Sequence, residues 1–182
     1  MIHRSKFIRF IRFCIFLCVI LNFSSCASGS TTPPDRMSYK MDISDKKFRQ
    51  NIVEYARYFL ERPYRKCGRD EKGFDCSGFV SYVLKNFHIA LPASSQDQSN
   101  VGKSIKIADT SPGDLVFFGD KKRIHHVGII TENHKDVLMV IHSSSSNGVI
   151  EENVLKSDYW HKRIRKFTNI QSYRTNKLVS NP

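Results

Sequence analysis

The chain has 182 residues, of which 40% are hydrophobic and 25% are charged, and its formal net charge is +12. This length and composition are ordinary for one globular domain, and the chain is long enough to bury a hydrophobic core. The positive charge invites a nucleic-acid partner, but the export signal at the N-terminus argues against one, so we expect no nucleic acid.

The first 25 residues have the anatomy of a secretory signal peptide. Residues 1–12 carry four basic residues and no acidic one, and the apolar run FCIFLCVILNF follows over 13–23. Such a short run is not long enough to span a bilayer comfortably as a helix. We therefore expect a cleaved signal over 1–25, with an uncleaved signal anchor as the alternative.

The signal ends in Phe23-Ser24-Ser25-Cys26, which resembles a bacterial lipobox, the motif whose cysteine is acylated and becomes the mature N-terminus. Lipidation of Cys26 would leave 157 residues with a formal charge of +8. Three acyl chains exceed what stable membrane anchoring needs. Because Ala27 stands where an aspartate often signals inner-membrane retention, we expect an outer-membrane lipoprotein that faces the periplasm.

Residues 26–43 are small, polar and proline-bearing, which indicates a lipidated N-terminus followed by a flexible tether. The pattern then becomes helical. Apolar residues recur every three or four positions from Phe48 to Leu60, and Ser44 can act as the N-cap. A second amphipathic helix is predicted to start near Cys76.

Beyond Pro112 the periodicity changes to short apolar runs divided by turn residues. The runs cover 115–118, 127–130, 137–141 and 149–150, with 163–170 as a further candidate. They predict a mostly antiparallel sheet of about five or six strands. Residues 65–73 are interpreted as a loop, and 91–104 as a loop or short helix. Helices first and strands afterwards indicate an α+β fold for a domain over 44–170, with a C-terminal tail over 171–182.

The domain holds two of the five cysteines, Cys67 and Cys76. Export makes a disulfide between them possible. A zinc site is poorly supported, because these cysteines are not two to four residues apart and the histidines lie far downstream. The third interpretation is a nucleophile, since Cys76 stands at a predicted helix start, where free amides and the helix dipole favour the thiolate.

A nucleophilic thiolate needs a base and a group that orients the base. His125 and His126 open one predicted strand, and His142 closes the next. A hairpin through 132–136 would bring His142 within reach of one of them. Successive strand residues point to opposite faces, so only one of the pair can point at the helix that bears Cys76. Spacing leaves open which one does, and whether the histidines pair only for structural reasons.

Four ordered blocks of sequence resemble the NlpC family of papain-like bacterial cell-wall cysteine peptidases. They are FDCSGFV at 74–80, PGDLVFF at 112–118, HVGII at 126–130 and IHSS at 141–144. The likeness extends over about residues 48–168, which is nearly the whole predicted domain. It implies a papain-like fold in which N-terminal helices pack on the sheet.

The resemblance also implies the catalytic roles. Cys76 corresponds to the nucleophile, His126 to the general base and His142 to the polar residue that orients the base. His125 is then the residue that faces away. Hydrolysis by such a trio requires no metal and no cofactor.

The resemblance further places substrate-binding residues around the nucleophile. Tyr64 is expected at the site as a helper that polarises the carbonyl, and Asp75 and Ser77 are expected to hold the free amine of the substrate. The family often has tryptophan and glycine where this chain has Lys66 and Cys67, which puts substrate preference in doubt. A 67–76 disulfide would block the nucleophile, so we expect both thiols, or at least that of Cys76, to be reduced.

The expected activity is hydrolysis of an amide bond in peptidoglycan stem peptides, most often between γ-D-glutamyl and a diamino acid. Three other activities on the same fold stay open: a cross-link-cleaving endopeptidase, an amidase and an acyltransferase. A catalytically inactive, envelope-binding lipoprotein is the alternative from another class. The expected partners are the stem peptides and, through the N-terminal lipid, a membrane.

Overall fold

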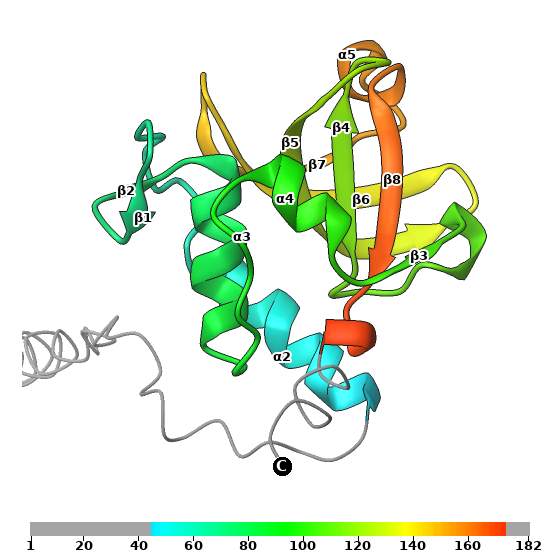
Figure 1. Ribbon diagram of the computed structural model, residues 1–182, viewed down its shortest axis with the longest axis horizontal. Helices are drawn as coiled ribbons and strands as arrows, with labels where there is room; N and C mark the ends of the chain where they lie inside the picture. Colours follow the sequence, from blue (N-terminus) through cyan, green and yellow to red (C-terminus); the bar gives the residue numbers. More distant parts are fainter. Residues whose placement is uncertain (1–44, 174–182) are drawn as a thin grey trace, which may run out of the picture. The chain divides into compact units, whose positions relative to one another are not determined.

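The computed structural model describes residues 45–173 of the chain (Figure 1). The predicted signal peptide, the predicted lipidation site at Cys26 and the predicted tether lie outside the described residues. Within 45–173, no helix combines the length and the apolar character needed to cross a membrane.

Helices and strands alternate little along the described chain, because most helices precede most strands (Figure 1). The helices are α2 (Asp45–Arg57), α3 (Cys76–Lys85), α4 (Ser95–Asn100) and α5 (Asp158–His161), with a 3-10 turn η1 (Ile107–Asp109). The strands are β1 (Arg69–Asp70), β2 (Gly73–Phe74), β3 (Lys103–Ile105), β4 (Leu115–Gly119), β5 (Ile124–His134), β6 (Val137–Ser144), β7 (Gly148–Asn153) and β8 (Ile164–Asn169).

Six of the strands form one sheet in the order β3-β8-β4-β5-β6-β7, and every neighbouring pair is antiparallel. Strands β1 and β2 form a separate short hairpin just before α3. The predicted α+β class and the predicted antiparallel sheet of five or six strands are therefore confirmed.

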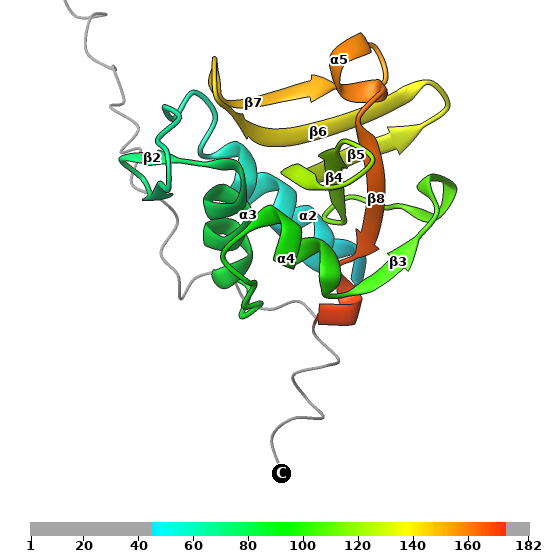
Figure 2. The ribbon, with the colours of Figure 1, turned by 45° about the horizontal axis from the view of Figure 1, so that its top comes forward.

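The sheet separates two hydrophobic cores. Helices α2, α3 and α4 lie together on one side of it (Figure 2). On β4, Leu115 and Phe117 belong to the core under these helices, whereas Val116 and Phe118 belong to a second core. Because β4 is buried along its whole length, its sequence is a continuous apolar run without alternation. The second core reaches Trp160 on α5, and the candidate site lies at this end.

A buried ion pair fixes α2 to the sheet. Arg49 is 7% exposed, and its Nη1 donates to Asp114 Oδ1 at 2.7 Å and to the carbonyl oxygen of Pro112 at 3.1 Å. The fully buried Asp114 carboxylate also accepts from the amides of Ser111 and Ile170, each at 2.9 Å. Burying these charges is tolerable because both carboxylate oxygens are hydrogen-bonded.

Some elements differ from the sequence prediction. Strand β3 lies in a segment interpreted as a loop or short helix, because a three-residue edge strand, mostly exposed, carries no hydrophobic alternation. The hairpin that joins β5 and β6 is tighter than the predicted turn over 132–136. Strand β5 continues to His134, and the turn contains Lys135, whose φ of 47° suits a two-residue hairpin turn.

Candidate active site

Asp75 caps α3 and thereby sets the position of Cys76, the first residue of that helix. Asp75 has an extended backbone, and its Oδ1 accepts from the Gly78 amide at 2.6 Å and from the Ser77 hydroxyl at 3.1 Å. An aspartate cap satisfies amides that the first turn leaves free. The half-buried Cys76 thus begins the helix beside its N-terminal amides.

The segment before α3 packs closely against the start of the helix. A Cβ atom on Gly78 would lie 2.0 Å from the carbonyl oxygen of Gly68, so only glycine fits there. The Asp75 amide donates to the same Gly68 oxygen at 3.0 Å. Tyr64 forms an isolated β-bridge with Phe74, which brings its partly exposed ring to the nucleophile end of α3.

A bulge at the start of β5 separates the two adjacent histidines. Phe118 pairs with His126 and Gly119 pairs with Ile124, so His125 has no opposite residue on β4. The chain therefore turns its backbone at His125 and sends the two rings in different directions. The predicted strand did not include this irregularity, because it depends on pairing with β4.

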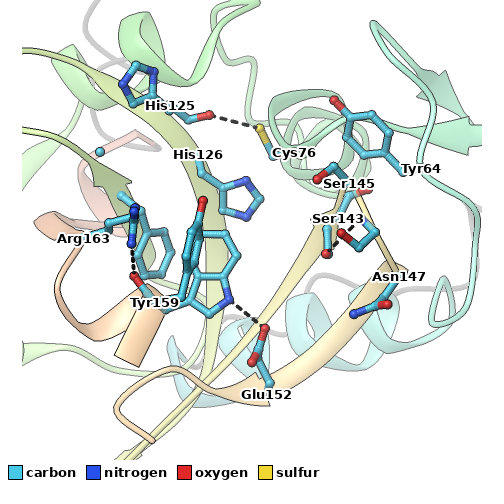
Figure 3. A pocket seen from close by; sticks show the side chains of 15 residues that line it. Tyr64, Cys76, His125, His126, Ser143, Ser145, Asn147, Glu152, Tyr159 and Arg163 are labelled. Carbon is cyan, nitrogen blue, oxygen red and sulfur yellow. Dashed lines mark hydrogen bonds between the residues drawn. The ribbon is translucent and has the colours of Figure 1, made fainter. Parts of the chain in front are cut away.

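The two rings have different surroundings. The exposed His125 ring lies 2.9 Å from Asp120 Oδ2, while its backbone carbonyl accepts from the Cys76 thiol at 3.8 Å. Figure 3 shows the His125 ring pointing away from Cys76 and the His126 ring extending into the pocket beside the thiol. The geometry thus puts His126, and not His125, on the side of the thiol.

His142 on β6 contacts Nε2 of His126, the ring nitrogen called the far nitrogen below. His142 is fully buried, its Nδ1 lies 2.9 Å from His126 Nε2, and the rings meet edge to face with centroids 4.8 Å apart. A Cβ atom on Gly128 would lie 3.1 Å from the Cβ of His142 and 2.4 Å from Val140 Cγ1. The missing side chain at Gly128 therefore leaves room for His142.

Glu152 on β7 and Trp160 on α5 enclose the histidine pair. Glu152 Oε1 lies 3.0 Å from His142 Nε2, and the Trp160 indole N–H donates to the same oxygen at 2.8 Å. The Trp160 ring stacks on His126 with centroids 4.6 Å apart and an interplanar angle of 26°. The His126 ring is consequently fixed by a hydrogen bond at one nitrogen and by stacking on one face.

These side chains line a pocket of about 720 Å³ (Figure 3). One wall contains Tyr159 and Arg163, whose guanidinium lies 3.8 Å over the Tyr159 ring. Figure 3 shows Ser145 and Asn147 across the pocket from these two residues. The lining also includes Tyr64, Cys76, Phe118, Gly119, His125, His126, Ser143, Ser144, Ser146, Glu152 and Trp160.

Burial governs the protonation of the thiol and the imidazole. Burial raises the pKa of Cys76 above its ordinary value of 9.0, and the Asp75 charge adds to this, although nearby backbone amides lower it. Burial, and then the neighbouring His142, hold the pKa of His126 well below its ordinary value of 6.5. Both shifts favour the neutral thiol of Cys76 and the neutral imidazole of His126. The helix start does not by itself produce the thiolate, so the thiol needs the base.

Comparison with known proteins gives this geometry a family. A model of the NlpC/P60 family matches residues 61–169, which contain all the pocket residues. The chain belongs to the NlpC/P60 family. The matched residues include both the capped helix α3 and the strands that carry His126 and His142.

Curated NlpC/P60 relatives are similar over much of the chain. The probable endopeptidase NlpC of Escherichia coli K12 is 32% identical over 155 residues, which are 83% of this chain and 94% of the relative. The γ-D-glutamyl-L-lysine dipeptidyl-peptidase of Bacillus subtilis is 32% identical over 133 residues, 71% of this chain but 44% of that protein. The murein endopeptidase MepS of Escherichia coli K12 is 36% identical over 110 residues, and this chain covers 56% of it.

Solved NlpC/P60 structures share the fold. An NlpC/P60 family protein from Bacillus cereus superposes with a TM-score of 0.62 at 26% identity, covering 66% of this chain and 39% of that one. The NlpC/P60 domain of the peptidoglycan hydrolase SagA superposes with a TM-score of 0.57 at 27% identity, covering 67% of this chain and 98% of the domain. These matches agree with the papain-like fold that the sequence predicted.

The three residues predicted to bind substrate in this NlpC/P60 domain have different positions. Tyr64 lines the pocket, and partial burial, followed by the charges of Cys76, Asp75 and Cys67, raises its pKa, so its hydroxyl keeps its proton. Asp75 and Ser77 are not among the residues that line this pocket: Asp75 Oδ1 caps α3, and Ser77 is 6% exposed. Their contact with substrate stays a prediction.

Cys67 and Cys76 are both free thiols, and Cys67 is exposed. Cys67 takes a left-handed backbone conformation, with φ 58°, in the turn that precedes β1. Among the described residues, no three histidine, cysteine, aspartate or glutamate side chains gather into a group that could hold a metal ion.

Sequence reasoning missed three residues of this NlpC/P60 site: Glu152, Trp160 and Arg163. Glu152 follows Glu151 on one strand, and only the pairing of β7 with β6 places it beside His142. Arg163 lines the pocket, although it stands beside Lys162 in a basic run that gives no local sign of a site. One signal in the sequence could have pointed to this part of the site: Trp160 is the single tryptophan of the chain.

Proposed function

We propose that this chain is a peptidoglycan hydrolase, a cysteine endopeptidase that cleaves an amide bond between γ-D-glutamyl and a diamino acid in stem peptides. The observation that carries the proposal is one pocket, in an NlpC/P60 domain, lined by both Cys76 and His126. His126 has its far nitrogen 2.9 Å from His142. The likeness to relatives named as a murein DD-endopeptidase and as a γ-D-glutamyl-L-lysine dipeptidyl-peptidase supports the substrate class.

Acylation starts from the neutral pair. His126 Nδ1 takes the thiol proton as Cys76 Sγ attacks the peptide carbonyl and a carbon–sulfur bond forms. The tetrahedral intermediate collapses, the carbon–nitrogen bond breaks, and His126 gives the proton to the leaving amine. A thioester on Cys76 remains. Water then attacks the thioester, His126 takes its proton, and the free acid leaves while the thiol is restored.

Donors near Cys76 are suited to stabilise the oxyanion of these steps. The amides of the first turn of α3 lie at the nucleophile, and the Tyr64 hydroxyl lines the same pocket. Pre-organised donors of this kind stabilise the developing charge more than the ground state. His142 orients the His126 ring and fixes its far nitrogen, which is the role that the third member of a catalytic triad has.

Arg163 is suited to recognise a carboxylate of the substrate. It is the one lysine or arginine that lines the pocket, and its contact with Tyr159 holds the guanidinium in place. A γ-linked D-glutamyl residue keeps a free α-carboxylate beside the bond to be cut. An arginine positioned at the wall can pair with that group and thereby select the γ-linkage.

We further infer an N-terminal lipid on Cys26 that anchors the protein in the outer membrane, with the domain facing the periplasm. The lipobox-like Phe23-Ser24-Ser25-Cys26 and the absence of aspartate at position 27 support this placement. The tether over 26–43 would give the domain reach toward the wall. Metabolic labelling with a fatty acid tests the anchor, because Cys26→Ala should abolish incorporation.

Digestion of defined muropeptides tests the function. The purified protein is incubated with monomeric and cross-linked muropeptides, and the fragments are identified by mass spectrometry, with Cys76→Ala as the control. We expect fragments ending in γ-D-glutamate and a new amine on the diamino acid. Cleavage of the cross-link, release of the whole peptide from the sugar, or transfer to an added amine would instead establish one of the other activities. Unchanged substrate would indicate an inactive binding protein.

A further inference from the structure

Glu152 is a carboxylate at the pocket for which the catalytic scheme above has no role. We propose that Glu152 is a positioning residue that fixes the direction of both hydrogen bonds in the chain Glu152–His142–His126, so that Nδ1 of His126 is left free to accept the thiol proton. The inference rests on the proposed function of the pocket. It adds a residue on β7 to the catalytic residues that α3, β5 and β6 carry.

The contacts of Glu152 and His142 fix where the hydrogens lie. An ionised carboxylate only accepts hydrogen bonds, so the 3.0 Å contact between Glu152 Oε1 and His142 Nε2 requires a hydrogen on that nitrogen. A neutral imidazole carries one N–H, so Nδ1 of His142 holds a lone pair. That lone pair lies 2.9 Å from His126 Nε2, which must therefore donate. The lone pair of His126 is then at Nδ1.

The carboxylate is ionised when the pair is neutral. The hydrogen bond from His142, and to a smaller degree the one from Trp160, lower the pKa of Glu152 against a partial burial that raises it. Without this acceptor, both directions of the His142–His126 hydrogen bond are open. The reversed direction puts the hydrogen on His126 Nδ1, where it removes the base.

Trp160 fixes the geometry of the hydrogen-bonded chain Glu152–His142–His126, called the relay below. Its indole N–H donates to the same Glu152 oxygen that faces His142, at 2.8 Å, and its ring stacks on His126. The stacking blocks rotation of the His126 ring, so the nitrogen bonded to His142 cannot exchange places with the other. One residue of α5 therefore holds both ends of the relay.

The charged groups around His126 determine whether loss of the Glu152 carboxylate raises or lowers the pKa of His126. The titratable groups that face it are Cys76 from α3, His142 from β6 and, through His142, Glu152 from β7. The His125 ring contacts Asp120. Arg163, which follows α5 in the chain, lies on the pocket wall. Glu152 is the anion of the relay, so its loss should destabilise the His126 imidazolium and lower the pKa of His126 further.

Glu151 supplies a matched control on the same strand. Its carboxylate accepts from Arg57 at 2.7 and 2.9 Å and from the Thr131 hydroxyl at 2.6 Å, and Glu151 does not line the pocket. Glu151→Gln and Glu152→Gln therefore remove one negative charge each, one residue apart. Only the second change reaches the histidine relay.

The first test needs no substrate. Long-range proton–nitrogen NMR spectra of protein labelled with 15N-histidine give the tautomer of each ring, with His126 assigned from a His126→Gln spectrum. At pH 8 we expect the Nε2–H tautomer for His126 in the wild type and in Glu151→Gln, and a mixture in Glu152→Gln. An Nδ1–H ring in the wild type, or an unchanged tautomer in Glu152→Gln, would overturn the proposal.

The second test is kinetic, and it fails separately if the pocket is not a peptidase. With the cleaved muropeptide, kcat of Glu152→Gln should fall about 10- to 100-fold with KM unchanged within about twofold, as for other carboxylates that orient a histidine. The acid limb of kcat/KM should move to lower pH. Glu152→Asp, which keeps the charge, should restore part of kcat, and Glu151→Gln should stay within about twofold of wild type. An unmoved pH profile in Glu152→Gln contradicts the proposed role.

Discussion

Two networks of polar side chains join distant parts of this domain, and they differ in whether they reach the pocket. Around Asp114 the network is closed, because Arg49 and two backbone amides hydrogen-bond both oxygens of the fully buried carboxylate. The network of Glu152, His142 and His126 is open, because both Glu152 and His126 line the pocket.

This difference separates stability from chemistry. A closed network gains from every bond that it makes and loses most when one partner is removed, since the other charge stays buried. An open network leaves one nitrogen for a substrate or a nucleophile, so its removal affects reaction more than folding. Substitutions in each network should therefore change different observables.

The largest effect is expected at the end of the open network. Cys76→Ala should lower muropeptide cleavage by more than about a thousandfold, because no other nucleophile replaces the thiol. The free energy of unfolding should change by about 1 kcal/mol or less, since the side chain is only half-buried. Cleavage assays and urea unfolding of one preparation measure both, and residual cleavage at the wild-type rate would remove Cys76 from the mechanism.

The closed network should show the opposite behaviour. Arg49→Met leaves the Asp114 charge buried without its cation, which should lower the free energy of unfolding by about 3–5 kcal/mol. Cleavage per folded molecule should hardly change. Arg57→Met is the matched control, because the Arg57 side chain in its pair with Glu151 is 46% exposed and the pair is expected to contribute less than about 1 kcal/mol. Equal losses of stability in the two variants would contradict the contrast.

A smaller effect is expected at the wall of the pocket. Arg163→Ala should raise KM about tenfold and leave kcat nearly unchanged, since the arginine is proposed to hold a carboxylate away from the reacting atoms. Steady-state kinetics with a substrate whose glutamyl carboxylate is amidated gives the control. The substitution should then matter little, and an equal rise in KM with both substrates would argue against carboxylate recognition.

The pH dependence of cleavage and of stability gives a further test of the open network. His126 has a lowered pKa and Cys76 a raised one, so the neutral pair should persist from below pH 6.5 to above pH 9.0 and give kcat/KM a broad plateau. The lowered pKa of His126 also means that stability falls as pH drops below 6.5, where the unfolded chain takes up the proton more readily. Cleavage rates and urea midpoints over pH 5–10 test both signs, and a narrow optimum near pH 7 would disagree.

The local part of the site could be predicted from the sequence, whereas the part made by strand pairing could not. Cys76 at a helix start follows from a polar turn ahead of an amphipathic run. The cap itself was missed, because the same Asp75 also suits a substrate contact in sequence. The two-strand spacing brought His142 near the adjacent histidines, but His126 was chosen only through the family resemblance.

The remaining residues depend on register and on long-range packing. The bulge that turns His125 away comes from pairing with β4, and the position of Glu152 comes from pairing between β6 and β7. Glu151 and Glu152 are identical in type and adjacent in sequence, yet one binds Arg57 and the other faces His142. No local signal distinguishes them, because strand neighbours differ only in the face to which they point.

The central claim is that the pocket works through His126 and not through its neighbour, and one pair of variants tests it most directly. Muropeptide cleavage is measured for His126→Ala and His125→Ala at pH 7.5, with folding checked by circular dichroism. We expect His126→Ala to abolish cleavage, and His125→Ala, whose exposed ring contacts Asp120, to keep most of it. An equal loss in both variants would contradict this account of the site.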